Sequence, residues 1–141
     1  MSADYPSMTT AEIRSKFLNF FEERGLKLYP SSSLVPDDPS LLLANAGMNQ
    51  FKEYYQGKKT MKEIGAISCQ KCVRTNDIDC IGEDGRHLSF FEMLGDFSFG
   101  GVSKQQACAW AFELITKEFK LPLDRLYFTV FTEDDETHDV W

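Results

Sequence analysis

The chain has 141 residues, a formal net charge of −7, 43% hydrophobic residues and 13% aromatic residues. This length suffices for one domain with a sizeable core. The acidic balance argues against a chain whose main task is to grip nucleic acid, because phosphate binding rests on Lys and Arg. No apolar run of about 18 residues and no secretory leader pattern occurs, so the sequence predicts a cytoplasmic protein with no membrane contact.

The first structured element is expected to be an amphipathic helix. Residues 1–9 show no periodic apolar face and predict a flexible leader without function. Thr10, with Glu12 close behind, can cap a helix that ends before Gly25. The apolar stripe of this helix comprises Ile13, Phe17, Leu18, Phe20 and Phe21. We expect its phenylalanines to make core or subunit contacts rather than cofactor contacts.

The segment from Leu26 to Gly57 predicts short elements joined by turns. Leu26 to Tyr29 and the apolar run Leu41 to Leu43 are expected as strands, and Phe51 to Gly57 as a short helix. Between them, Gly47 suits a close backbone approach. Asn45 can donate a hydrogen bond to a substrate or can simply stabilise a turn.

Two strands and a loop dominate the middle of the chain. Ile67 to Arg74 and Arg86 to Leu94 read as antiparallel strands, and Thr75 to Gly85 is a polar loop with two glycines. Alternation at period two would place Arg86, Leu88, Phe90 and Glu92 on one face. Such a face suits a ligand that is part anion and part flat ring, such as ATP, because guanidinium groups bind phosphate and a phenyl ring stacks on a purine. An ordinary half-solvated hairpin is the alternative.

Four cysteines raise the question of a metal site. Cys69 and Cys72 form a CxxC pair, and Cys80 and His87 follow. Residues three apart in a strand point to opposite faces, so Cys69 and Cys72 would need a turn between them to share one ion. We therefore expect reduced, mostly buried thiols and no metal in this chain.

The remainder predicts one helix and one strand. Ser103 can cap a helix that runs to about Phe119, and Leu126 to Phe131 alternates as a strand before an acidic tail. The whole pattern predicts an α+β fold, with an antiparallel sheet that carries the site and helices near Thr10–Arg24 and Ser103–Phe119 packed against it.

Three separated motifs resemble one protein family. They are Asn45 to Lys52 (NAGMNQFK), Gln70 to Arg74 (QKCVR) and Phe90 to Gly100 (FFEMLGDFSFG). In this order they resemble the amino-terminal part of alanyl-tRNA synthetase, a class II aminoacyl-tRNA synthetase. The resemblance implies that residues 10–141 are the first part of a catalytic domain that activates alanine with ATP and Mg²⁺ and transfers it to tRNA(Ala).

The resemblance also implies roles for individual residues. Arg74 would bind the α-phosphate of ATP and stabilise charge as the alanine carboxylate attacks. Arg86 and His87 would touch the β- and γ-phosphates, and Phe90 would stack on adenine. Glu92 or the backbone of Met93 would meet the adenine edge. Strand alternation groups Arg86, Phe90 and Glu92 and puts His87 on the other face.

Two departures from the family pattern bear on these roles. Arg74 is followed directly by Thr75-Asn76-Asp77, without the Gly-Gly-Lys-His stretch of the family, and Gly101 to Lys104 replaces Asp-Tyr-Phe-Lys. We therefore expect the phosphates of ATP to be bound more weakly or by different residues. The third class II motif, most of the alanine pocket, the tRNA-binding helices and the zinc-dependent editing module are expected beyond Trp141, so residues 1–141 alone should be inactive.

Three interpretations are therefore possible. The chain can be a fragment of a ligase, a stand-alone ATP-binding or regulatory paralogue without ligase activity, or a half-domain that only packs or dimerises. The sequence leaves homo-oligomerisation open.

Overall fold

A small mixed sheet lies at the centre of the computed structural model, which describes residues 7–75 and 78–141. Its strands are β1 (Lys27–Leu28), β2 (Gly65–Val73) and β3 (Phe90–Ser98), in the order β1-β2-β3. β1 runs parallel to β2, and β2 runs antiparallel to β3. The expected α+β class and the antiparallel pair are thus confirmed, although the sheet is not purely antiparallel.

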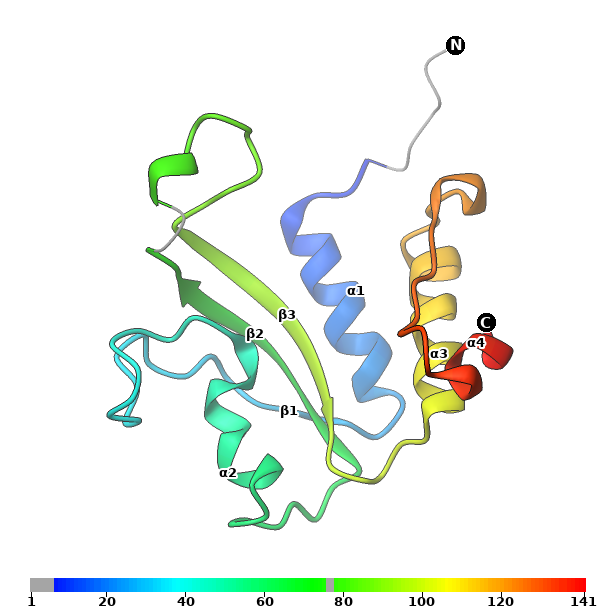
Figure 1. The fold of residues 1–141 in the computed structure, drawn as a ribbon, viewed down its shortest axis with the longest axis horizontal. Helices are drawn as coiled ribbons and strands as arrows, with labels where there is room; N and C mark the ends of the chain where they lie inside the picture. The colour runs from blue at the N-terminus through cyan, green and yellow to red at the C-terminus, as the bar shows by residue number, and fades with distance from the viewer. Residues whose placement is uncertain (1–6, 76–77) are drawn as a thin grey trace.

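Helices cover both faces of this sheet. Figure 1 shows α1 (Thr10–Glu22) along one face, with α3 (Lys104–Glu113) and α4 (Asp135–Val140) beyond it. A 3-10 helix, η1 (Gly47–Phe51), leads into α2 (Lys52–Tyr55) on the opposite side of the sheet. No helix in the described part of the chain is long and apolar enough to cross a membrane.

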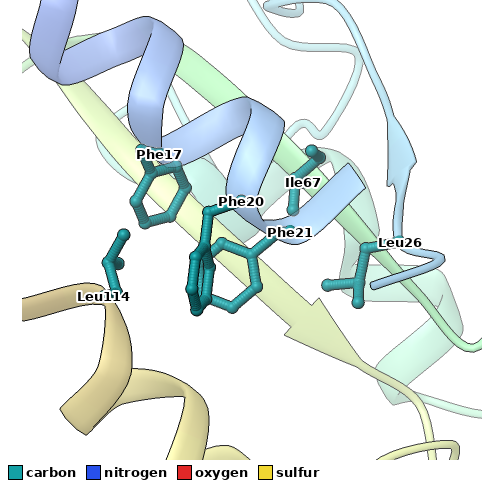
Figure 2. Packing of buried hydrophobic residues seen from close by; sticks show 6 residues of the cluster. All are labelled: Phe17, Phe20, Phe21, Leu26, Ile67 and Leu114. Carbon is teal, nitrogen blue, oxygen red and sulfur yellow. The ribbon is translucent and has the colours of Figure 1, made fainter. Parts of the chain in front are cut away.

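The main core lies between α1 and the sheet. Figure 2 shows its buried residues, which are Phe17, Phe20, Phe21, Leu26, Ile67 and Leu114. The phenylalanine stripe of the first helix is therefore a core stripe, as its helical spacing predicts. The N-cap is Thr9 rather than Thr10, because Thr9 and Glu12 form a reciprocal capping box. Of the predicted leader, residues 1–6 lie outside the described residues.

The β2–β3 register assigns the side chains to faces. Val73 pairs with Phe90, Lys71 with Glu92, and Ile67 with Asp96. Because Ile67 packs into the α1 core, Phe90 and Glu92 also lie on the α1 side of the sheet. The alternate positions face η1 instead, and they include Gln70, Cys72, Phe91 and Met93.

The second strand of the hairpin begins later than predicted. It starts at Phe90 instead of Arg86, and the loop is correspondingly longer. Gly82 and Gly85 adopt positive φ angles of 90° and 67°, and the Asp84 carboxylate accepts the backbone N–H groups of Arg86 and His87. These turn interactions remove the backbone donors that a strand would need. Within the predicted loop, Asn76 and Asp77 lie outside the described residues.

Two predicted strands are absent from the described residues. Leu41 to Leu43 lies in a turn in which Asp38 accepts the backbone N–H of Ser40, and Leu42 is 93% exposed. Leu126 to Phe131 has no strand partner among the described residues, although its pattern is that of a strand. Apolar residues form a strand only when a neighbouring strand takes up the backbone hydrogen bonds, and neither segment has such a neighbour within residues 7–75 and 78–141.

The carboxyl-terminal helices follow the predicted boundaries more closely. Ser103 caps α3 by accepting the N–H of Gln106, and a π-helical turn (Leu114–Glu118) extends the helix to the predicted end. Lys120 then adopts a positive φ of 52° ahead of a short 3-10 helix (Leu123–Arg125). The acidic tail is partly helical, because Asp134 caps α4.

Candidate nucleotide site

Arg74 lies at the end of β2 and is held in a defined position. Its backbone N–H donates to Ser89 O at 2.9 Å, which continues the β2–β3 ladder by one pair. Its Nε donates to the carbonyl oxygen of Asn45 at 3.1 Å, and its guanidinium carbon lies 5.4 Å from the centroid of the Phe91 ring. The half-buried side chain makes no other hydrogen bond within residues 7–75 and 78–141. The terminal nitrogens of the guanidinium can therefore meet an anion bidentately.

Asn45 contributes its backbone to this arrangement. The carbonyl oxygen of the preceding residue, Ala44, accepts the N–H of Val73 at 2.9 Å, so the Ala44–Asn45 segment runs beside the end of β2. The Asn45 side chain is exposed, and its Oδ1 accepts from Asn49 Nδ2 at 3.2 Å. The contact with Asn49 uses only the Oδ1 atom of Asn45. Its geometry is therefore compatible both with donation from Nδ2 to a substrate and with a role in stabilising the turn.

Met93 lies on the same face as Phe91 and meets the backbone of η1. Its Sδ accepts from the N–H of Gly47 at 3.2 Å. A Cβ atom at Gly47 would come within 3.2 Å of the Phe97 ring and 3.9 Å of Met93 Sδ. The close backbone approach expected at Gly47 is thus present, and it seals η1 onto the sheet.

Phe90 and Glu92 lie on the other face of the sheet, toward α1. The Glu92 carboxylate accepts from Arg14 of α1, at 3.1 Å from Nε and 2.6 Å from Nη2. These hydrogen bonds lower the pKa of Glu92. Sequence reasoning missed Arg14 because it is 78 residues from Glu92 and no local pattern links the two. Phe90 is 55% exposed, so one side of its ring is open to a flat ligand.

Arg86 and His87 lie in the loop before β3, and both are exposed. The Nδ1 of His87 lies 2.6 Å from Asp84 Oδ2. The two backbone N–H groups that Asp84 accepts and the imidazole beside it lower the pKa of Asp84 to about 2. Because Arg86 and Leu88 precede the strand, the predicted face of Arg86, Leu88, Phe90 and Glu92 does not form as one set. Only Phe90 and Glu92 share a strand face.

The sequence analysis also missed Phe91 as the ring under Arg74. Side-chain alternation along the two strands could have identified this ring. Once Val73 is paired with Phe90, alternation at period two puts Arg74 and Phe91 on one face. Cys69 and Cys72 lie on opposite faces of β2, as strand geometry predicts. Burial raises the pKa of both thiols.

The arrangement suits a nucleoside triphosphate better than a bare metal ion. Arg74 offers a positioned cation, Phe90 and Phe91 offer rings on either face of β3, and Arg86 adds positive charge in the adjoining loop. Among the described residues, no group of three or more His, Cys, Asp or Glu side chains is placed to hold a metal ion.

Comparisons with known proteins identify the family. Residues 12–141 match the sequence model of the tRNA synthetases class II (A). The chain is 54% identical over 129 residues to the chloroplastic/mitochondrial alanine–tRNA ligase of Sorghum bicolor, which covers 92% of this chain and 13% of that protein. It is 51% identical over 141 residues to the alanine–tRNA ligase of Synechocystis sp., covering 100% of this chain and 16% of that protein. The chain thus spans only a small part of these relatives, and it belongs to the family of class II tRNA synthetases (A).

Proposed function

We propose that the chain is the first part of the catalytic domain of an alanine–tRNA ligase and that Arg74 binds the α-phosphate of ATP. The observation that carries this proposal is the half-buried Arg74 guanidinium, fixed by the Asn45 carbonyl above the Phe91 ring with its terminal nitrogens open. The alanine–tRNA ligases to which the chain is 51% and 54% identical support alanine and tRNA(Ala) as the other substrates.

The proposed chemistry begins with adenylation. The carboxylate oxygen of alanine attacks the α-phosphorus, a phosphorus–oxygen bond forms, and pyrophosphate leaves with the electron pair of the broken bond. Arg74 would stabilise the negative charge that builds up on the nonbridging oxygens in the transition state. The terminal hydroxyl of tRNA(Ala) then attacks the carbonyl carbon of the adenylate, and AMP leaves. Mg²⁺ bound to the phosphates would neutralise part of the charge in the first step.

The exposed groups of the hairpin loop would act at the far end of the triphosphate. We propose that Arg86 and His87 contact the β- and γ-phosphates, with Asp84 holding the His87 ring in place. If adenine stacks on Phe90, which shares the α1 face of the sheet with Glu92, then Glu92 and the backbone of Met93 would meet its edge, and Arg14 would restrain Glu92. The free thiols suit a reducing compartment such as the cytoplasm.

Alanine-dependent exchange of pyrophosphate into ATP tests the proposal in the full-length protein that contains these residues. Arg74→Ala should lower exchange roughly a hundred- to thousand-fold, as expected for the loss of one charge-stabilising donor, ~2.7–4 kcal/mol. Lys71→Ala is the matched control, because Lys71 is an exposed cation on the same strand that points toward the α1 side. An Arg74→Ala protein with near wild-type exchange would refute the role of Arg74.

Pyrophosphate exchange by the unmodified protein distinguishes the ligase hypothesis from the paralogue hypothesis. A protein that exchanges pyrophosphate only with alanine present is a ligase. A protein that binds ATP but shows no amino-acid-dependent exchange is an ATP-binding or regulatory paralogue, and the missing Gly-Gly-Lys-His stretch after Arg74 is the sequence feature that would favour that outcome.

A further inference from the structure

Gln70 is a buried polar residue of β2 on the same face of the sheet as Cys72 and Phe91. It is 1% exposed, and both ends of its side-chain amide are hydrogen-bonded. Its Oε1 accepts from the backbone N–H and the hydroxyl of Ser32 and from Gln50 Nε2, at 2.8, 3.1 and 3.1 Å. Its Nε2 donates to Ser32 O at 3.2 Å and to Lys71 O at 2.8 Å. Gln70 therefore joins β2 to two other segments, the loop that contains Ser32 and η1.

The connection to η1 runs through Gln50. Besides donating to Gln70, Gln50 Nε2 lies 3.3 Å from the carbonyl oxygen of Pro30, so the same side chain reaches the loop that precedes Ser32. Gln50 lies near the end of η1, next to Phe51, which is 1% exposed and whose ring centroid is 4.8 Å from that of the tilted Phe97 ring. The last turn of η1 is thus fixed to the sheet by both polar and aromatic contacts.

The other end of η1 lies beside Arg74. Gly47 begins the helix and donates to Met93, and Asn45, two residues earlier, accepts from Arg74 Nε. The segment 44–50 is short and partly helical, and it is hydrogen-bonded to the sheet at each end. A shift at the Gln50 end would therefore move the Asn45 carbonyl, because one rigid turn of helix separates them.

Ser68, a second buried polar residue on this face, differs from Gln70 in its hydrogen bonding. It is 0% exposed and lies two residues before Gln70 on the same face, yet its Oγ has no hydrogen-bond partner in the described part of the chain. Gln70, by contrast, satisfies both ends of its amide with groups from segments that approach the site. An apolar side chain of similar size could fill the same space, so packing alone does not account for a hydrogen-bonded amide at position 70.

We infer that Gln70 is a positioning residue for the nucleotide site: by holding η1, it keeps the Asn45 carbonyl where it fixes the Arg74 guanidinium above Phe91. This inference rests on the proposed function, because Arg74 is the residue that would bind the α-phosphate. Gln70 itself does not touch the substrate. Its contribution passes through Gln50, the η1 backbone and the Arg74 Nε hydrogen bond.

The first measurement uses the 141-residue chain and needs no substrate. Nitrogen-15 NMR of arginine side chains reports the exchange of the Arg74 Nε–H proton with water, which the hydrogen bond to Asn45 slows. Gln70→Met, close in shape but without the amide, should speed this exchange about ten-fold or more, as expected when an intramolecular hydrogen bond is lost. Ser68→Ala is the matched control and should leave the exchange unchanged. Equal exchange rates in Gln70→Met and the unmodified chain would overturn the inference.

Gln50→Met guards against a general loss of structure, because Gln50 is only half-buried and its replacement leaves Gln70 in place. It removes the link between Gln70 and η1 and should reproduce the faster Arg74 exchange. If Gln70→Met speeds the exchange but Gln50→Met does not, the path through η1 is wrong.

The second measurement is a double-mutant cycle in the full-length protein, followed by pyrophosphate exchange. Gln70→Met should lower kcat/KM for ATP about ten-fold, equivalent to ~1.4 kcal/mol, with little change in the KM for alanine. In an Arg74→Ala background it should cost less than about two-fold more, because the residue that it positions is gone. Losses that multiply in the double variant would show that Gln70 acts independently of Arg74 and would overturn the inference. If the unmodified protein shows no exchange, the proposed function fails, and the NMR result still decides whether Gln70 positions Arg74.

Discussion

Phe21→Ala tests the core that holds α1 on the sheet. Phe21 is 3% exposed and lies among aromatic rings of two helices, as Figure 2 shows in part. Its ring centroid is 5.0 Å from that of Phe17, 5.1 Å from Phe20 and 6.3 Å from Trp110. The substitution would remove a whole ring from this cluster and leave a cavity between α1 and α3.

The expected loss follows from burial and from these ring contacts. Truncation of a buried phenylalanine costs about 3–5 kcal/mol, which includes the lost transfer free energy and the cavity left behind. Edge-to-face aromatic pairs add about 0.5–1.5 kcal/mol beyond the buried area, which favours the upper part of that range. A domain of this size loses roughly 2–4 °C in Tm per kcal/mol, so a fall of about 10 °C or more is expected.

Urea unfolding of the chain, followed by circular dichroism, measures this change. Tyr127→Ala is the control, because Tyr127 is 91% exposed, and such surface changes usually stay within about 0.5 kcal/mol. The free energy of unfolding should therefore fall far more for Phe21→Ala than for Tyr127→Ala. Similar losses in the two variants would refute the placement of the core between α1 and the sheet.

Two further predictions concern the faces of β3. A comparison of Phe91→Ala with Phe90→Ala in the full-length protein identifies the ring that stacks on adenine. The variant without the stacking ring should show a KM for ATP raised about ten-fold, in line with ~1–3 kcal/mol per stacked base, and a nearly unchanged KM for alanine. The geometry favours Phe91, which shares the face of Arg74, and equal ATP and alanine effects in both variants would exclude stacking on β3. Glu92→Gln should cost about 0.2–1 kcal/mol of unfolding free energy at neutral pH, because the Arg14–Glu92 pair is about a third exposed and screened by solvent. Arg14 lowers the folded-state pKa of Glu92 below the ordinary 4.5, so this contribution is present above that pH and is lost as pH falls through the folded-state pKa. The difference in unfolding free energy between variant and wild type should therefore shrink in urea titrations at acid pH. A difference that grew there would contradict the pairing.

Local patterns determined several parts of this protein. The capping box and the 3.6-residue apolar period placed α1 to within one residue at its start, and the same period identified Phe17, Phe20 and Phe21 as core. The two apolar runs around a polar loop specified the antiparallel pair β2–β3. These features depend on interactions between residues close in sequence or on side-chain alternation along one strand, and both can be read from the sequence.

Tertiary structure decided the features that depend on a distant partner. Arg14 meets Glu92, and Gln70 meets Ser32 and Gln50, across long stretches of chain that no period connects. Where the second strand begins was decided by the turn at Asp84, which competes for the same backbone donors as the ladder. Residues 126–131 have the alternation of a strand but no paired neighbour among the described residues. A strand requires backbone hydrogen bonds from another segment, and the presence of that segment is a property of the fold rather than of the local sequence.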